Sequence, residues 1–154
     1  MKELRRQDRS ITQEEARAFL NKAEYGVLST VTADGKPYGV PLSFCIIDQC
    51  LYFHCAVEGQ KLDNLEHNQS VSFCVVGNVE LLPEQFGTKY QSVVVAGQAE
   101  EVFASDKQTA LEALVRKYSP QFVDKGLKYI DAMTQKARVF RISMNSVSGK
   151  ARKR

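Results

Sequence analysis

The sequence predicts a small β-barrel of the α+β class, with about six mainly antiparallel strands and three or four short helices. Two observations predict this fold. Apolar runs rich in β-branched and aromatic residues are separated by short turns, and amphipathic stretches with helical spacing lie between some of these runs. Strands joined by short turns pair antiparallel, and a sheet of this size tends to curl into a barrel whose open ends are covered by helices.

A helix is expected near the N-terminus. Thr12 and Glu15 have the spacing of a capping box, in which each side chain bonds the backbone N–H of the other residue. The apolar residues that follow recur at i, i+3, i+4 and i+7, so they share one face of a helix. These residues are Ala16, Phe19, Leu20 and Ala23.

Three strands in a meander are expected next. The first covers residues 25–32 and leads into a turn, Ala33–Lys36, that contains the Asp-Gly pair typical of hairpins. The second strand covers residues 38–47, and the third covers residues 51–56. Because the connecting turns are short, these strands are expected to be neighbours in space.

The remaining strands are shorter or interrupted. Residues 58–68 break the strand pattern, and the spacing of Leu62 and Leu65 predicts a helix there. Gly77-Asn78 separates two later strands, and Gly97 is expected at a β-bulge because glycine within a strand often marks one. The strands expected after residue 68 cover residues 70–76, 79–82, 90–102 and 139–144.

The clearest helix is expected over residues 105–118. Ser105 and Gln108 have capping-box spacing, and an apolar stripe follows them. The stripe contains Leu111, Leu114, Val115 and Tyr118. A further helix is expected between Pro120 and Gln135, after a turn.

Length and composition indicate one globular domain over residues 1–154, with 1–10 and 149–154 as tails. The chain has 44% hydrophobic and 25% charged residues, which excludes wholesale disorder. No apolar run approaches the roughly 18–20 residues of a membrane span, and the N-terminus lacks the apolar core of a secretory signal. We therefore expect a cytoplasmic protein with no membrane partner.

Two further classes of function are weak candidates. The four cysteines form no CxxC pair, and only two histidines accompany them, so no metal site is expected and the thiols are interpreted as reduced and buried. Residues 136–154 carry seven basic residues and no acid, while the net charge is only +3. This basic end lacks interleaved aromatic residues, so nucleic-acid binding is not expected.

Two neighbouring segments depart from routine strand behaviour. Pro41 lies within a predicted strand, where it cannot donate a ladder hydrogen bond, so nearby backbone groups are free to bond a planar ligand. The alternative is an edge strand without a ligand. After residue 56 a strand gives way to a helix, and the free N–H groups of that helix start, together with Lys61 and His54, suit a phosphate. The alternative is a solvated helix start. A ring joined to a phosphate describes a mononucleotide cofactor, and flavin mononucleotide (FMN) fits best.

The motifs, in their order and spacing, resemble the FMN-binding split-barrel superfamily. That group contains the pyridoxamine 5′-phosphate oxidases, and the similarity is greater to its branch related to 5-nitroimidazole resistance proteins. The resemblance implies a six-stranded, mainly antiparallel split β-barrel. The segments that carry it are residues 25–30, 34–42, 51–56, 59–64, 88–94 and 148–152.

The resemblance also implies a homodimer with FMN at the subunit interface and a set of cofactor-binding residues. Residues at the proline-containing strand would line the flavin ring, and residues around the helix start would surround the phosphate. Ser92 would match a residue that makes a polar contact to the flavin ring or its ribityl chain, from the same subunit or from the other one. The full predicted set is Val40, Pro41, Leu42, Ser43, His54, Cys55, Gln60, Lys61, Leu62, Asn64 and Ser92.

The true oxidases carry an arginine near the position of Val40 and an Arg-Lys pair at the position of Gln60-Lys61. Pyridoxamine phosphate oxidation is therefore not expected here, and FMN retention is expected to be weaker. The branch resemblance implies an FMN-dependent, nitroreductase-like oxidoreductase acting on a small molecule, with His54 as a catalytic proton donor. The alternative role of His54 is to hold phosphate or backbone. The alternative function is a non-enzymatic flavin- or haem-binding protein, with His54 or His67 as an axial ligand.

Overall fold

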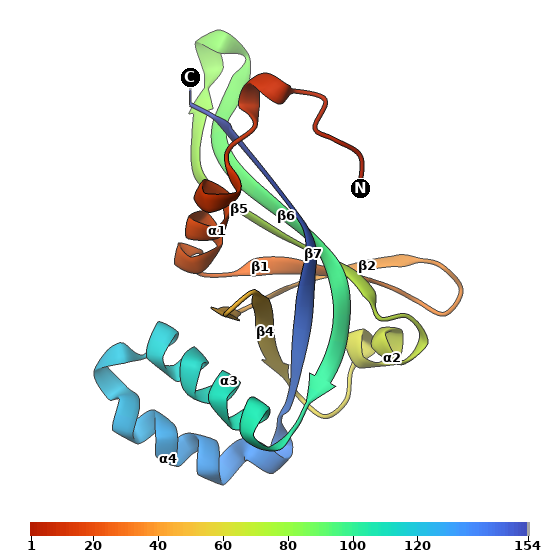
Figure 1. Cartoon of the computed structure of the whole chain (residues 1–154), viewed down its shortest axis with the longest axis vertical. Helices are drawn as coiled ribbons and strands as arrows, with labels where there is room; N and C mark the ends of the chain where they lie inside the picture. The colour runs from red at the N-terminus through yellow and green to blue at the C-terminus, as the bar shows by residue number, and fades with distance from the viewer. Residues whose placement is uncertain (154) are drawn as a thin grey trace.

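The computed structural model describes residues 1–153, which form a seven-stranded antiparallel sheet with four α-helices (Figure 1). The strands are β1 (Gly26–Val31), β2 (Pro37–Leu42), β3 (Cys45–Ile47), β4 (Cys50–Cys55), β5 (Ser70–Leu82), β6 (Gly87–Val102) and β7 (Arg138–Arg152). The helices are α1 (Gln13–Lys22), α2 (Gln60–His67), α3 (Ala104–Tyr118) and α4 (Val123–Met133). Short 3₁₀ turns cover Gln7–Arg9, Pro83–Gln85, Pro120–Phe122 and Thr134–Lys136.

The two outer strands of the sheet are close together in the chain. The strand order is β2-β1-β5-β6-β7-β4-β3, so β2 and β3 are the edges. Only Ser43 and Phe44 separate them, and three peptide steps of about 3.8 Å span at most roughly 11 Å. The sheet therefore curls until its edges approach each other, and no ladder pairs them among the described residues. This unpaired seam is what splits the barrel.

The seam divides one predicted strand, and the sheet has seven strands where about six were expected. The strand expected over residues 38–47 is broken at Ser43-Phe44 into β2 and β3. Pro41 lies in β2, an edge strand, which is where a residue without an N–H is tolerated.

The long strands β5, β6 and β7 differ from expectation at two of three points. The bulge at Gly97 is confirmed, because the β6–β7 register shifts between Ala96 and Gly97. Gly77-Asn78 does not end a strand: the register shifts between Gly77 and Glu80, and β5 continues to Leu82. Strand β7 continues to Arg152, opposite Tyr90, so most of the predicted C-terminal tail is part of the sheet, and residue 154 lies outside the described residues.

Aromatic side chains fill the barrel. Phe44, Phe53 and Phe73 are fully buried in the main core cluster. The ring centroids of Phe44 and Phe73 lie 4.8 Å apart in an edge-on arrangement. A second core cluster lies where α3 packs against β3 and β4 and α4 packs against α3, and it includes Leu111, Leu114 and Ile130.

Only one of the two expected capping boxes is present. At α1, Thr12 Oγ1 accepts a hydrogen bond from the Glu15 N–H at 3.1 Å, and Glu15 Oε2 accepts one from the Thr12 N–H at 2.8 Å. Helix α3 instead begins at Ala104, directly after an N-cap Phe103 whose side chain makes no capping hydrogen bond. Ser105 therefore lies inside the first turn.

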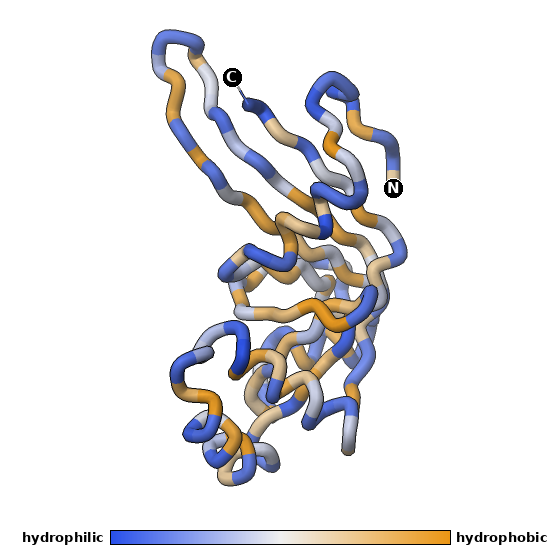
Figure 2. Tube along the Cα trace, turned by 60° about the vertical axis from the view of Figure 1, so that its left-hand side comes forward, coloured by the Kyte–Doolittle hydropathy of each residue, from blue (hydrophilic) through white to orange (hydrophobic). Residues whose placement is uncertain are grey.

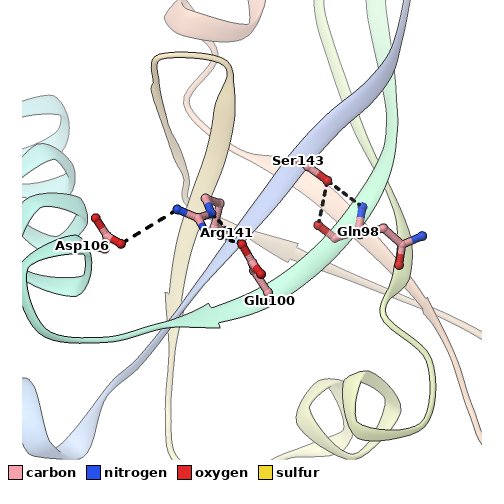
Figure 3. A network of polar contacts seen from close by, with 5 residues as sticks. All are labelled: Gln98, Glu100, Asp106, Arg141 and Ser143. Atoms are coloured by element: carbon pink, nitrogen blue, oxygen red, sulfur yellow. Dashed lines mark hydrogen bonds and ion pairs between the residues drawn. The ribbon is translucent and has the colours of Figure 1, made fainter.

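A polar network holds the start of α3 against the sheet (Figure 3). Arg141 on β7 pairs with Glu100 on β6, and its guanidinium also lies 4.0 Å from Asp106 in the first turn of α3. These contacts fix the point at which the chain leaves β6 and crosses to the helices. Within residues 1–153, no helix is both long enough and apolar enough to cross a bilayer.

Candidate functional site

His54 lies one residue before the end of β4 and faces outward. Its neighbours Phe53 and Cys55 are buried in the core, whereas His54 is exposed, as alternation along a strand requires. The His54 imidazole makes no hydrogen bond to any described residue. Although the residue is exposed, surrounding protein atoms partly desolvate its imidazole, and this desolvation, followed by the positive charge of Lys61, lowers its pKa below the usual value. His54 is therefore largely neutral at pH 7, and its ring nitrogens are available to a ligand.

Helix α2 begins beside His54 with two uncommitted amides. Its N-cap is Gly59, at φ 146°, a left-handed conformation that favours glycine. The carbonyl of Gly59 accepts the N–H groups of Leu62 and Asp63, at 3.1 and 3.2 Å. The N–H groups of Gln60 and Lys61 donate to no acceptor among residues 1–153. They lie at the positive end of the helix dipole, next to the Lys61 ammonium.

The side chains of Leu62 and Asn64 have a different role from the one predicted. They are 3% and 1% exposed and face the barrel. Asn64 Nδ2 donates to Thr30 Oγ1 at 2.9 Å, and Asn64 Oδ1 accepts from Gln60 Nε2 at 2.7 Å. Asn64 thus anchors α2 to β1, and the side-chain amide nitrogen of Gln60 is turned back along the helix. At Gln60 it is the backbone N–H that remains available to an anion.

The cysteine thiols are poorly suited to nucleophilic chemistry. Burial raises the pKa of Cys45 to about 11 and also raises the pKa values of Cys55 and Cys74. Cys55 is 8% exposed in the main core cluster, so its side chain points away from the surface on which His54 lies. Among the described residues, no three His, Cys, Asp or Glu side chains group as a metal site.

The predicted ring-binding residues lie at the seam. Val40 and Leu42 are half-buried and pack against the core, while Pro41 and Ser43 are exposed. Val40, Pro41 and Leu42 each pair with β1 on one side and have no strand on the other side. Ser43 and His54 line the same cleft, so the structure brings the end of β2 and the end of β4 together.

Ser92 lies far from this site within one chain. On β7, Val139 pairs with His54 on one side and with Val102 of β6 on the other. Ser92 lies on β6, ten residues before Val102. Ten residues of strand span about 33 Å. Ser92 is also 7% exposed, packed between β5 and β7. The structure therefore does not place Ser92 beside His54 of the same chain.

Two residues at the end of α3 hold the seam: Lys117, which the sequence analysis did not single out, and Tyr118, which it assigned only to an apolar stripe. The Phe44 N–H donates to the Tyr118 hydroxyl at 3.0 Å, and Lys117 Nζ donates to the Phe44 carbonyl at 2.8 Å. The Tyr118 hydroxyl itself donates to the Glu24 carbonyl at 2.6 Å. The Lys117 ammonium lies 3.9 Å from the centre of the Phe44 ring, and burial lowers the pKa of Lys117. Side chains at the end of α3 thus replace the strand pairing that the seam lacks.

A large cleft adjoins the seam. Its volume is about 740 Å³, within the range typical of small-molecule sites. Helices α3 and α4 form its walls, and Ser43 and His54 lie at its sheet side. Sequence reasoning assigned Leu111, Leu114, Val115 and Tyr118 to an apolar stripe and could not show that all four line a cleft.

The basic ends of the chain meet at a second, polar hollow of about 370 Å³. Arg6 in this hollow pairs with Asp8 at 2.6 Å, and Glu15 lies among the other lining residues. Two carboxylates therefore offset part of the local positive charge. The remaining basic residues at this hollow are Arg9, Arg152 and Lys153.

Comparison with known families identifies the chain. The family model for pyridoxamine 5′-phosphate oxidase matches residues 12–151. The chain belongs to the pyridoxamine 5′-phosphate oxidase family. This confirms the family that the motifs predicted. No curated protein matches the sequence of this family member.

Solved structures with the same fold bind different cofactors. A candidate 5-nitroimidazole antibiotic resistance protein from Bacteroides thetaiotaomicron is 22% identical, with a TM-score of 0.78, over 91% of this chain and 84% of that one. A FAD-binding protein from Mesorhizobium loti is 27% identical, with a TM-score of 0.67, over 94% and 97%. A FAD- and haem-binding protein from Mycobacterium smegmatis is 18% identical, with a TM-score of 0.74, over 93% and 72%.

Proposed function

We propose that this oxidase-family protein is an FMN-dependent oxidoreductase of the nitroreductase-like type, acting on a small molecule. The observation that carries the proposal is the start of α2, where the N–H groups of Gln60 and Lys61 are uncommitted and where the charge of Lys61 is near enough to His54 to lower its pKa. This donor set fits a phosphate monoester. Bound FMN would accept and donate electrons, with a reduced nicotinamide as the expected electron donor.

The residues of this chain divide the work of holding the cofactor. Gln60, through its backbone, and Lys61 would bind the phosphate. The free edge of β2 from Val40 to Leu42 would offer backbone groups to the polar edge of the flavin ring. Lys117 and Tyr118 would fix the position of that edge by holding Phe44.

Cofactor titration tests the proposal. The purified chain is expected to take up FMN, with a shift of the flavin absorption band and quenching of flavin fluorescence, and then to oxidise a reduced nicotinamide in the presence of a nitroaromatic acceptor. FAD, titrated in parallel, separates the mononucleotide from the dinucleotide. Absence of uptake of either flavin would refute the proposed cofactor site.

His54 is proposed as the proton donor to the reduced substrate. Because its pKa is lowered, the protonated fraction at pH 7 is small and increases as the pH falls toward that pKa. The rate of nitroaromatic reduction is therefore expected to rise between pH 8 and pH 5.5 in the native protein. In His54→Gln the rate should be lower and lack that rise. Equal pH profiles for the two proteins would limit His54 to binding.

We further propose that the protein is a homodimer. The paired strands β5 and β6 extend beyond the body of the molecule as an arm, which we define as residues 76–92 (Figure 2). Large apolar side chains on this arm are exposed to solvent, and isolated chains rarely expose several such groups together. They are Val76, Val79, Leu81 and Phe86, at 54%, 60%, 74% and 98% exposure. A second copy that covers the arm would bring the base of the arm, with Ser92, toward the partner's flavin.

Haem binding is the second candidate. The observation that favours it is His54 at the sheet side of a largely apolar cleft, an arrangement that suits an axial ligand and a porphyrin. The absorption spectrum of the purified chain after haemin addition separates the candidates. A Soret shift that disappears in His54→Ala would support haem, and an unshifted spectrum would exclude it.

A further inference from the structure

The cleft between α3 and α4 has apolar walls and is open to solvent. Aliphatic and aromatic side chains from both helices line it, and Phe122 and Tyr129 at its mouth are 62% and 66% exposed. The apolar lining consists of Leu111, Leu114, Val115, Tyr118, Phe122, Tyr129, Ile130, Met133 and Ala137. Exposed aromatic side chains around a cleft of about 740 Å³ suit a flat, apolar molecule.

Contacts at both ends of the helix pair fix the spacing between α3 and α4. At one end, Gly126 on α4 lies so close to Val115 on α3 that a side chain there would clash. At the other end, Lys107 on α3 donates to the carbonyls of Thr134 and Ala137, at 2.7 and 2.8 Å. The cleft is therefore largely formed before a ligand enters.

The charged groups at the cleft are all basic. No aspartate or glutamate is among its lining residues within the described chain, whereas Lys125 and Lys136 are. The acidic residues of α4, Asp124 and Asp131, are not part of the lining. An anionic group on a ligand would meet favourable charge here, and a cationic group would not.

We propose that this cleft binds a flat, apolar acid: a ring system that carries a carboxylate or a similar anion, with the rings between α3 and α4 and the anion toward Lys125 and Lys136. Ser43 and His54 belong to both the cleft and the proposed flavin site, so an occupant of the cleft would lie next to the flavin. That this acid is the substrate class rests on the proposed function. That it binds in the cleft does not.

Two dyes of similar shape test the charge preference. Anilinonaphthalene sulfonate is a flat apolar anion, and phenylnaphthylamine is its counterpart without the sulfonate. Both fluoresce more strongly in apolar sites. In the flavin-free protein, Lys125→Gln/Lys136→Gln is expected to weaken binding of the sulfonate about tenfold and to leave binding of the neutral dye unchanged. Lys128→Gln, on the same helix but outside the cleft, is the matched control and should change neither.

The outcomes separate this proposal from the alternatives. Equal affinity of the double variant and the native protein for the sulfonate would overturn the proposal. So would displacement of the dye by haemin with a His54-dependent Soret shift, which would assign the cleft to haem. Dye release at protein concentrations where the dimer forms would assign the cleft to a second copy and overturn it as well. An unchanged affinity of the double variant for FMN would support a cleft separate from the flavin phosphate, whatever the result of the flavin titration in the native protein.

Discussion

Replacing Lys61 by alanine is expected to raise the dissociation constant for FMN about ten- to hundredfold. Lys61 is a cation at the start of α2, beside two uncommitted amides, and loss of a hydrogen bond to a charged group costs about 1.5–3 kcal/mol. Its side chain forms no ion pair among the described residues, so the midpoint of thermal unfolding should change little. Fluorescence quenching of the flavin measures the affinity, and circular dichroism measures the stability.

Riboflavin provides the control for this substitution. It carries the same ring without the phosphate, so Lys61→Ala should leave its affinity unchanged, and Lys61→Arg should restore much of the affinity for FMN. The same alanine variant should raise the pKa of His54, because the charge of Lys61 is the second cause of its lowered value. Equal losses of FMN and riboflavin affinity would show that the phosphate binds elsewhere.

The double substitution Leu81→Asp/Phe86→Asp is expected to dissociate the homodimer. Both side chains are among the most exposed apolar groups of the arm, and burying an uncompensated carboxylate at an interface costs several kcal/mol. The dissociation constant of the dimer should therefore rise at least about a hundredfold. Sedimentation velocity over a range of concentrations measures this change directly.

Phe103→Asp is the matched control for the arm. Phe103 is 66% exposed but lies between β6 and α3, outside the arm, so this variant should remain dimeric. If FMN binds at the subunit interface, the arm variant should also lose FMN affinity in proportion to the monomer fraction. A dimer of unchanged stability in the double variant would move the interface to another face.

Local sequence patterns predicted the strands and helices where local forces decide them. The capping box at Thr12, the bulge at Gly97 and a helix beginning near residue 60 are set by nearby residues, and all three are present. The break at Ser43-Phe44 was not predictable in this way. It depends on Lys117 and Tyr118, more than 70 residues away, which bond the backbone of Phe44.

The site was predicted only in outline, because local patterns set some of its residues and distant contacts set the others. Helical spacing placed Lys61 at a helix start, where the structure has it, and the same spacing put Leu62 on the core face together with Leu65. Asn64 was predicted to contact the cofactor because it belongs to residues 59–64, one of the segments that carry the family resemblance. Its partner Thr30 lies on another strand, so its buried anchoring role appears only when the fold is known.

The position of β7 in the sheet has a consequence for how the protein is made. Of the seven described strands it is synthesised last, yet it lies between β6 and β4 and joins the two halves of the sheet. While the ribosome still holds residues 138–152, the nascent polypeptide exposes an unpaired side of β4 and of β6. Residues 138–152 must therefore leave the ribosome before the barrel can close, and until then the unpaired strand edges expose the chain to aggregation.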